Sequence, residues 1–288
     1  MIRIGIIGVG NTIGIAGNHI RAYKLCGDAK ITAVYDLLPE RAAEYVERYA
    51  LEGAVACRSL GELFGLCDAV SICTPNAAHG SLSVEALRAG LHVLCEKPFA
   101  PSPEECREAV RYAKLSDRVA MIGLCYRDIP GLVYMKQLID EGRIGKVFFV
   151  REEQGGDRIA SPAVKLEWRM QRDLSGPGAL ADFGSHMMDI CDYLLRASCG
   201  RIQEIHCMQD CVIKEREIIG QPGVMGAVTN EDVACWTCRT EKGTLYNFTA
   251  SRVGAAGCEL GQRFFSLDRR EELTGYLSEA GIELAGLH

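Results

Sequence analysis

The stretch IRIGIIGVGNTIG, residues 2–14, is a short run of mostly β-branched residues that leads directly into a glycine-rich turn. A buried strand followed by such a turn and a helix is typical of the first βαβ unit of a parallel sheet. Glycines there let backbone amides approach a pyrophosphate, and the N-terminus of the next helix favours its negative charge. The pattern is G-x-G-x-x-x-G, so the third glycine is displaced from the usual spacing. The candidate nucleotide-binding residues of the turn are Gly8, Gly10, Asn11 and Gly14, and a plain tight turn is the alternative.

Short apolar runs continue to alternate with amphipathic stretches up to about residue 124. This alternation predicts an α/β domain over residues 1–124, a doubly wound parallel sheet with helices on both faces. The expected strands are 2–7, 30–35, 54–57, 69–73, 92–94 and 120–123, and the expected helices are 19–26, 39–49, 59–65, 78–89 and 103–115. Sheets of this kind bind ligands at the carboxyl ends of their strands, so residues just after strands are the candidates for a site.

The pattern changes after residue 124, and residues 125–288 predict a second, α+β domain with an open, mostly antiparallel sheet. Its expected helices are 131–141 and 178–195, and its expected strands are 146–152, 202–214, 232–240 and 244–252. Residues 241–243, Glu-Lys-Gly, predict a hairpin turn between the last two strands. Residues 253–288 are rich in leucine, glycine and glutamate and show no clear strand pattern.

The composition is that of a globular chain. Of the 288 residues, 48% are hydrophobic and 24% are charged, which excludes a disordered or collagen-like chain. The formal net charge of −6 disfavours nucleic acid and anionic membranes as partners. No apolar run reaches the roughly 18 residues of a membrane-spanning helix. The N-terminus lacks the features of a signal peptide, so we expect a cytoplasmic protein.

Fourteen cysteines are scattered through the chain, many of them inside apolar runs. Their share is below that of a disulfide scaffold, so we expect them to behave as small hydrophobic side chains in a reducing compartment. The best candidate metal ligands are Cys207, Cys211, Cys235 and Cys238. Both pairs lie in strand-like sequence without the glycine turn of a zinc site, and we therefore expect no bound metal.

An acidic residue ends the second expected strand, at the distance where nucleotide-binding folds place a partner for the adenosine ribose. Asp36 would accept hydrogen bonds from the ribose hydroxyls, and its charge would repel the 2′-phosphate of NADP. This residue therefore favours NAD as the cofactor, with NADP possible. A structural aspartate in the turn before Pro39 is the alternative.

Two further loops follow the fourth and fifth expected strands. The first is Thr74-Pro75-Asn76, with His79 three residues on, and the second is Glu96-Lys97-Pro98. Both are expected where an open α/β sheet places its ligand-contacting loops. The proline restrains the backbone of the lysine before it. A surface loop with a solvated lysine is the alternative.

A polar row is expected on the helix that begins near residue 178. Asp182, His186 and Asp189 recur at i, i+4 and i+7 and so share one face of an otherwise apolar helix. Polar side chains are costly to bury unless they are paired. The row therefore indicates a catalytic site or an internal hydrogen-bond network, and a metal site is the third possibility.

In this order along the chain, the motifs resemble the Gfo/Idh/MocA family, named for glucose-fructose oxidoreductase and inositol dehydrogenase. The resemblance covers residues 2 to about 252 and is most specific in E-K-P at 96–98 and D-x-G-x-H-x-x-D at 182–189. It implies a Rossmann domain followed by an α+β domain. It also implies an NAD(P)-dependent oxidoreductase that transfers a hydride between the nicotinamide and a CH–OH carbon of a sugar or polyol.

The resemblance assigns roles by position in this sequence. Gly8, Gly10 and Asp36 would hold the adenosine end of the cofactor, and residues of the two loops would line its nicotinamide side: Thr74, Pro75, Asn76, His79, Glu96 and Lys97. Lys97, Asp182 and His186 match the catalytic trio. His186 would be the general base, Lys97 would stabilise charge on the reacting oxygen, and Asp182 would orient the substrate or His186. Further candidates for the substrate crevice are Tyr126, Arg127, Trp168 and Arg169, and a surface or packing role is the alternative for each.

Two expectations concern the C-terminal sheet. Family members usually continue beyond the last strands seen here, so the open sheet is expected to lack edge strands, either naturally or by truncation. The same sheet is where family members commonly form homo-oligomers. Two other functions stay open: an NAD-dependent glycosidase of the same superfamily, and a non-catalytic NAD-binding protein.

Overall fold

The structure is a computed structural model that describes residues 1–10, 14–254 and 260–266. Contacts within the chain divide it into two units. The first comprises Met1–Gly123 and Gln171–Gly176, and the second comprises Leu124–Met170 and the chain from Pro177 onward. Each unit is described by itself.

The N-terminal apolar run forms the centre of a six-stranded parallel sheet in the first unit, as predicted. The strand order is β3-β2-β1-β4-β5-β6, so the order reverses between β1 and β4. In open α/β sheets this reversal creates the crevice where ligands bind. The strands are β1 (Ile2–Ile7), β2 (Ala29–Tyr35), β3 (Val55–Cys57), β4 (Ala69–Ile72), β5 (His92–Cys95) and β6 (Ala120–Ile122).

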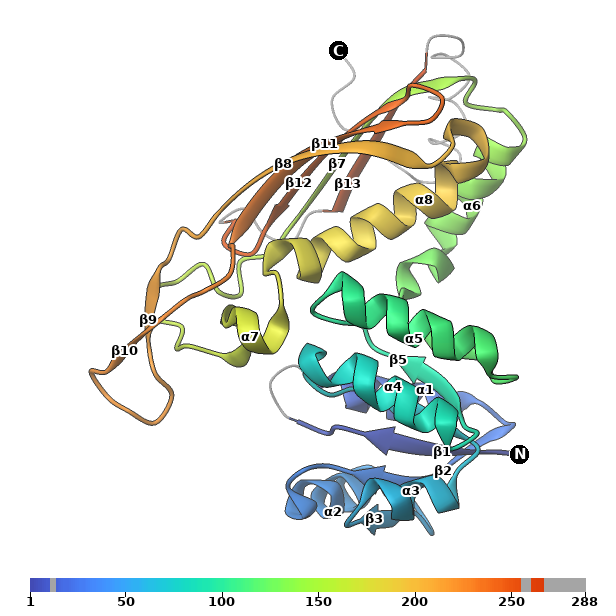
Figure 1. Ribbon diagram of the computed structural model, residues 1–288, viewed down its shortest axis with the longest axis vertical. Coiled ribbons are helices and arrows are strands. Elements are labelled where there is room, and N and C mark those ends of the chain that lie inside the picture. Colours follow the sequence, from blue (N-terminus) through green and yellow to red (C-terminus); the bar gives the residue numbers. More distant parts are fainter. Residues whose placement is uncertain (11–13, 255–259, 267–288) are drawn as a thin grey trace. The chain divides into compact units, whose positions relative to one another are not determined.

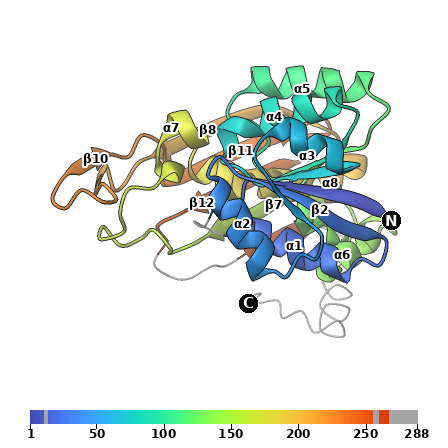
Figure 2. The ribbon, with the colours of Figure 1, turned by 90° about the horizontal axis from the view of Figure 1, so that it is seen from below.

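Helices cover both faces of this sheet (Figure 2). Ile20 and Tyr45, from the first two helices, pack in one apolar cluster, and Leu63 and Leu87, from the third and fourth, pack in the other. The helices are α1 (Ile15–Leu25), α2 (Pro39–Arg48), α3 (Leu60–Leu66), α4 (His79–Arg88), α5 (Pro103–Leu115) and α7 (Arg172–Ser175). The first helix begins four residues earlier than expected, directly after Gly14, whose φ of 69° ends the turn.

The second unit contains a five-stranded sheet in the order β13-β7-β12-β11-β8 (Figure 1). Only the neighbours β7 and β12 run parallel, so the predicted mostly antiparallel sheet is confirmed. The strands are β7 (Val147–Gly155), β8 (Ile202–Asp210), β11 (Val233–Thr240), β12 (Leu245–Ser251) and β13 (Leu260–Ser266). The helices α6 (Pro130–Asp140) and α8 (Ser185–Cys199) pack on one face of the sheet, over Trp236 and Phe248, whose rings stack at 5.0 Å.

Two expectations for this unit were wrong. The strand expected over 202–214 ends at Asp210, because the Asp232 carboxylate accepts the backbone N–H groups of Val212 and Ile213 and turns the chain away. The chain then forms a separate two-stranded sheet from β9 (Glu215–Glu217) and β10 (Met225–Ala227). Residues 260–266 form an edge strand on β7, although their sequence lacks a strand pattern. Backbone pairing, which composition does not reveal, defines that strand.

The expected helix over 178–195 is also not uniform. Residues Leu180–Gly184 form a π-helical turn, and the regular helix α8 begins at Ser185. The Ser185 hydroxyl donates to the carbonyl of Ala181 at this junction. Single π turns inside helices occur frequently at functional sites.

The thirteen cysteines of the described ranges are all free thiols. Cys235 is exposed whereas Cys238 is buried, because odd and even positions of β11 point to opposite faces of the sheet. These two thiols therefore do not form a chelating pair. Among residues 1–10, 14–254 and 260–266, no helix has the length and hydropathy to cross a bilayer.

Candidate functional site

The glycine turn after β1 requires its first glycine. Gly8 has a φ of 85°, and a Cβ atom placed on it would lie 2.6 Å from Thr74 Cγ2 and 2.8 Å from the Thr74 nitrogen. The end of β1 thus lies directly against the end of β4, which brings two of the predicted cofactor loops together. Asn11, also expected in this site, lies outside the described residues.

Asp36 lies at the end of β2 with its carboxylate turned toward the same turn. Its Oδ2 atom accepts the Val9 N–H at 2.9 Å, and its Oδ1 atom accepts the Leu38 N–H at 3.0 Å. Arg41 Nη1 lies 3.9 Å from Oδ1. A carboxylate has about four acceptor sites, so these contacts leave acceptor capacity for a pair of hydroxyl groups.

The turn has the features that a dinucleotide needs. Gly10 is exposed, and a Cβ atom on it would meet no other atom within 4 Å, so the space on that side of the turn is open. The Thr74 hydroxyl is buried without a hydrogen-bond partner in the described part of the chain. Backbone amides at a helix N-terminus suit a pyrophosphate, and an unsatisfied buried hydroxyl fits a polar ligand group.

His79 joins the two loops that follow β4 and β5. Its Nε2 atom lies 2.7 Å from the Thr74 carbonyl oxygen, and its Nδ1 atom lies 2.8 Å from the Pro98 carbonyl oxygen. The residue is 1% exposed. Both ring nitrogens face backbone carbonyls, so this geometry suits a residue that fixes the loops. Asn76 is also buried, and its Nδ2 donates to the Ser175 carbonyl of α7.

Glu96 is held by a residue that the sequence did not single out. Its Oε1 atom lies 2.8 Å from His19 Nε2, and its Oε2 atom accepts the backbone N–H of Lys97 at 3.2 Å. Burial alone would raise the pKa of the Glu96 carboxyl, but the hydrogen bond and charge of His19, together with the backbone N–H and charge of Lys97, hold that pKa below its usual value. The carboxylate therefore stays ionised and anchors the backbone of Lys97, which precedes a cis peptide bond to Pro98.

In the second unit, each member of the polar row meets a partner from another segment. Asp182 Oδ1 lies 3.5 Å from Arg169 Nη1. The His186 ring stacks on the Tyr126 ring with centroids 4.0 Å apart. Asp189 accepts two hydrogen bonds from the Arg127 guanidinium. Of the alternatives open from the sequence, the geometry favours a site or a paired network, since no cluster of three potential metal ligands occurs in the described ranges.

The partners come from two short 3₁₀ turns, Cys125–Asp128 and Trp168–Met170. Within the second turn the Arg169 guanidinium lies over the Trp168 ring, 4.9 Å from its centroid. Burial lowers the pKa of Arg169 below its ordinary value. A cation with little water around it interacts strongly with a carboxylate or a hydroxyl group, so the segment between Trp168 and Asp182 is suited to hold a polar ligand.

The predicted site residues thus form two groups. The first unit brings together the glycine turn, Asp36 and the loops after β4 and β5, and the second brings together Asp182, His186 and the residues expected at the substrate. Sequence reasoning missed His19 and Gln154, whose Nε2 donates to the Tyr126 hydroxyl. A polar residue inside an apolar helix or strand is the signal that could have found each of them.

Comparison with known proteins identifies both units. Residues 2–124 match an oxidoreductase family with an NAD-binding Rossmann fold, and residues 132–274 match the GFO/IDH/MocA C-terminal domain. The chain belongs to the Gfo/Idh/MocA family. The resemblance inferred from the motifs is therefore confirmed, and the first unit is the NAD-binding Rossmann domain of this family.

Several proteins of named activity are similar to the chain. Levoglucosan dehydrogenase of Pseudarthrobacter phenanthrenivorans is 30% identical over 257 residues, 82% of this chain and 64% of that protein. Inositol 2-dehydrogenase of Rhizobium meliloti is 33% identical over 153 residues, 52% of this chain and 44% of that protein. A levoglucosan dehydrogenase solved in complex with NADH superposes with a TM-score of 0.83 at 26% identity, over 92% of this chain and 71% of that one. The chain thus spans only 44% to 64% of the length of these two curated relatives.

Proposed function

We propose that the protein is an NAD-dependent dehydrogenase that oxidises a secondary hydroxyl group of a sugar or polyol. The observation that carries the proposal is the polar row of the π turn and α8, in which His186 lies flat on Tyr126 and Asp182 faces Arg169. An imidazole and a carboxylate held in this way are a base and an orienting group for a hydroxyl substrate. The NAD-binding Rossmann fold of the first unit supplies the matching cofactor site.

The residues of the first unit would divide the cofactor between them. Asp36 would accept hydrogen bonds from the adenosine ribose, and the amides near Gly8, Gly10 and Gly14 would meet the pyrophosphate. The loop of Thr74, Pro75 and Asn76, with Glu96 and Lys97, would line the nicotinamide. When bound, NAD accepts a hydride at C4 of its nicotinamide ring.

The reaction requires the loss of a hydride from carbon and of a proton from the hydroxyl group. In the proposal, His186 accepts that proton, because an imidazole titrates near neutral pH. Lys97 donates a hydrogen bond to the same oxygen and stabilises the charge that develops on it. Asp182 orients the substrate through a second hydroxyl group, together with Arg169, Trp168 and Arg127.

The substrate class follows from the activities of the relatives. Levoglucosan dehydrogenase and D-glucoside 3-dehydrogenase of Escherichia coli act on sugars, and inositol 2-dehydrogenase acts on a cyclic polyol. We therefore propose a ring-shaped substrate with several equatorial or axial hydroxyl groups. A polyhydroxylated ring can use several hydrogen-bond partners at once, which suits a site that presents Asp182, His186 and Arg169 on neighbouring segments.

The test is the initial rate of NADH formation at 340 nm with NAD and a panel of levoglucosan, methyl glucosides, aldoses and inositols. The proposal predicts turnover of at least one compound and a loss of about a thousandfold in kcat for His186→Ala, since general-base catalysis contributes about 10²–10⁴. Release of an aryl group from an aryl glycoside without net NADH would instead indicate the glycosidase. Thermal stabilisation by NAD with no turnover would indicate the non-catalytic binder.

We also propose that two copies associate through the open face of the five-stranded sheet. Met208 on β8 is 81% exposed and pairs with the exposed Cys235 of β11 on the face opposite the buried Trp236 and Cys238, and both residues line a hollow there. Large exposed apolar patches mark interaction sites. Light scattering should give a mass larger than one chain, and Met208→Lys should reduce it; a monomeric wild type would contradict the proposal.

We propose in addition that the protein works in the cytoplasm, because the free thiols of the described residues support a reducing compartment.

A further inference from the structure

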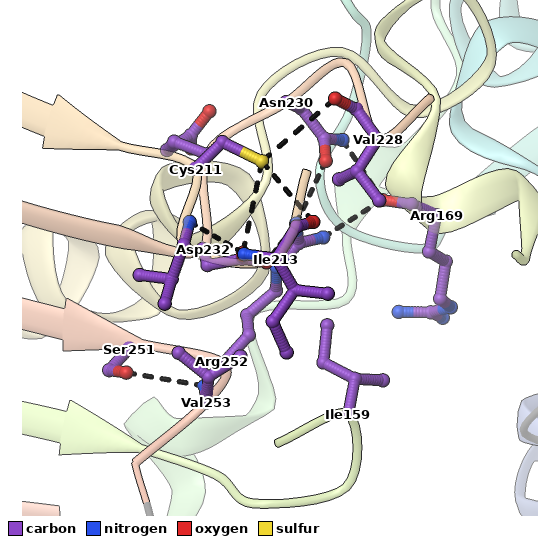
Figure 3. A network of polar contacts seen from close by, with 12 residues as sticks. Ile159, Arg169, Cys211, Ile213, Val228, Asn230, Asp232, Ser251, Arg252 and Val253 are labelled. Atoms are coloured by element: carbon purple, nitrogen blue, oxygen red, sulfur yellow. Dashed lines mark hydrogen bonds and ion pairs between the residues drawn. The ribbon is translucent and has the colours of Figure 1, made fainter. Parts of the chain in front are cut away.

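The backbone carbonyl of Arg169 accepts hydrogen bonds from two side chains, Asn230 and Arg252, which lie 61 and 83 residues later in the chain. Asn230 Nδ2 donates to it at 2.9 Å and Arg252 Nη1 donates to it at 2.8 Å (Figure 3). Directly beside this carbonyl, the Met170 carbonyl accepts the Thr229 N–H at 2.9 Å. Arg169 is thus fixed through its main chain, which leaves its guanidinium directed at Asp182.

Glu231, the residue after Asn230, fixes the start of the helical segment that carries Asp182. The Glu231 carbonyl accepts the Ala179 N–H at 3.1 Å, and Glu231 Oε1 accepts the Leu180 N–H at 3.0 Å. The first N–H groups of a helix have no partner within the helix, and the two Glu231 oxygens accept hydrogen bonds from two of them. Gly178 lies so close that a Cβ atom on it would be 2.0 Å from the Glu231 carbonyl oxygen. The helix start therefore rests on the main chain of Glu231.

A buried ion pair joins Arg252 to residues 230–232. The side chains of Arg252 and Asp232 are 5% and 1% exposed. Arg252 Nη2 lies 3.3 Å from Asp232 Oδ1 and 2.8 Å from Asn230 Oδ1. The other oxygen of Asp232 accepts two backbone N–H groups, at Val212 and Ile213. A buried charge pair is stable only when its remaining hydrogen-bonding groups are also satisfied, and these contacts largely meet that condition.

We propose that Asn230, Glu231, Asp232 and Arg252 form a brace that sets the position of Arg169 relative to Asp182 and thereby determines how tightly the site binds its sugar. These four are positioning residues, since none of them is placed at the reacting atoms. Asn230 reaches the turn that carries Arg169, and its neighbour Glu231 reaches the helical segment that carries Asp182. A shift of residues 230–231 therefore moves both sides of the Arg169–Asp182 ion pair. The proposal rests on the function proposed above.

The test uses variants that remove one contact each. Asn230→Asp keeps the shape and the acceptor for Arg252 but loses the donor to the Arg169 carbonyl. Glu231→Ala removes the acceptor for Leu180, whereas Glu231→Gln retains an acceptor oxygen. Glu204→Ala, at an exposed position of β8, is the control. Removal of Arg252 itself is avoided, because it would leave Asp232 charged and buried.

Two readouts separate positioning from general stability. We expect Asn230→Asp and Glu231→Ala to raise the KM for the sugar about tenfold, the effect of one buried hydrogen bond, and to change kcat and the KM for NAD less than threefold. Glu231→Gln and Glu204→Ala should stay within twofold of the wild type in every parameter. Equal KM values for all variants, or a Glu231→Gln as impaired as Glu231→Ala, would overturn the proposal.

Backbone hydrogen exchange, measured without sugar, tests the brace independently of activity. We expect faster exchange in residues 168–170 for Asn230→Asp and in residues 179–182 for Glu231→Ala, with α6 unchanged. Unchanged exchange in these segments would overturn the brace even in an active enzyme. If the wild type oxidises no sugar, the proposed function fails, and the exchange data still decide whether the brace exists.

Discussion

The phenol ring of Tyr126 lies against the imidazole of His186, with ring centroids 4.0 Å apart and ring planes 8° from parallel. The Tyr126 hydroxyl in turn accepts a hydrogen bond from Gln154 Nε2 at 3.2 Å, on a buried position of β7. The orientation of the proposed base is therefore set from the sheet outward, through one amide and one aromatic ring.

Tyr126→Ala should lower kcat about tenfold, because an aromatic pair contributes about 0.5–1.5 kcal/mol and its loss lets the imidazole rotate. Tyr126→Phe keeps the stack and loses only the contact with Gln154, so its kcat should stay within threefold of the wild type. Steady-state kinetics at saturating NAD give both values. Equal kcat for Tyr126→Ala and the wild type would show that the ring does not orient His186.

Gly8→Ala and Gly10→Ala should separate folding from cofactor binding. Alanine at position 8 meets Thr74 and a φ of 85°, so Tm should fall by roughly 5 °C, the effect of strain of about 1–3 kcal/mol. Alanine at position 10 meets no atom within 4 Å and should leave Tm unchanged. Its methyl group would occupy the space proposed for the pyrophosphate, so the gain in Tm with NAD should disappear. A full NAD-induced shift in Gly10→Ala would contradict this placement.

Asp36→Asn should reduce the preference for NAD over NADP at least tenfold, which corresponds to about 1.4 kcal/mol. The amide retains the shape but not the charge that would repel a 2′-phosphate, and Arg41, 3.9 Å from the carboxylate, becomes available to pair with the phosphate. The ratio of kcat/KM for the two cofactors measures the effect. Adding Arg41→Ala should remove the gain in NADP use; an unchanged ratio in Asp36→Asn would show that another residue selects the cofactor.

Glu96 should make the stability of the protein depend on pH in the acid range. Its pKa in the folded protein lies below the ordinary value of 4.5, so the stabilisation is present above pH 4.5 and is lost as the pH falls through the folded pKa. At pH 7, Glu96→Gln should lower the free energy of unfolding by about 2 kcal/mol, the contribution of a hydrogen bond to a charged group.

Urea titrations of wild type and Glu96→Gln from pH 7 to pH 3 measure this difference. The gap between the two proteins should narrow toward pH 3, and the exposed Glu52→Gln should show no gap at any pH. A gap that stays constant down to pH 3 would mean that the ionised form of Glu96 is not the one that His19 stabilises.

The sequence alone was sufficient for the parallel sheet, because its strands are buried on both faces and read as continuous apolar runs. It was not sufficient for β13, since pairing with β7 defines that strand and Gly261 interrupts its pattern. The spacing of Asp182 and His186 also does not reveal the π turn over Leu180–Gly184. At the end of that turn, Gly184 packs against Trp236.

The candidate residues were found where chemistry-bearing side chains recur at fixed spacing in one short motif. Their supports were missed because they lie far away in sequence. His19 is 77 residues from Glu96, and Arg252 is 83 residues from Arg169. Such contacts depend on how the sheet brings distant segments together, and a single sequence carries no direct signal of that arrangement.

The central claim is that Lys97, Asp182 and His186 act on one substrate hydroxyl group beside the nicotinamide. A crystal structure with NAD and an accepted sugar tests it most directly, through the distances from the reacting oxygen to Lys97 Nζ and His186 Nε2. We expect both distances to be about 3 Å, within hydrogen-bond range, with the carbon facing nicotinamide C4. A sugar bound elsewhere, or a hydroxyl group that reaches neither side chain, would contradict it.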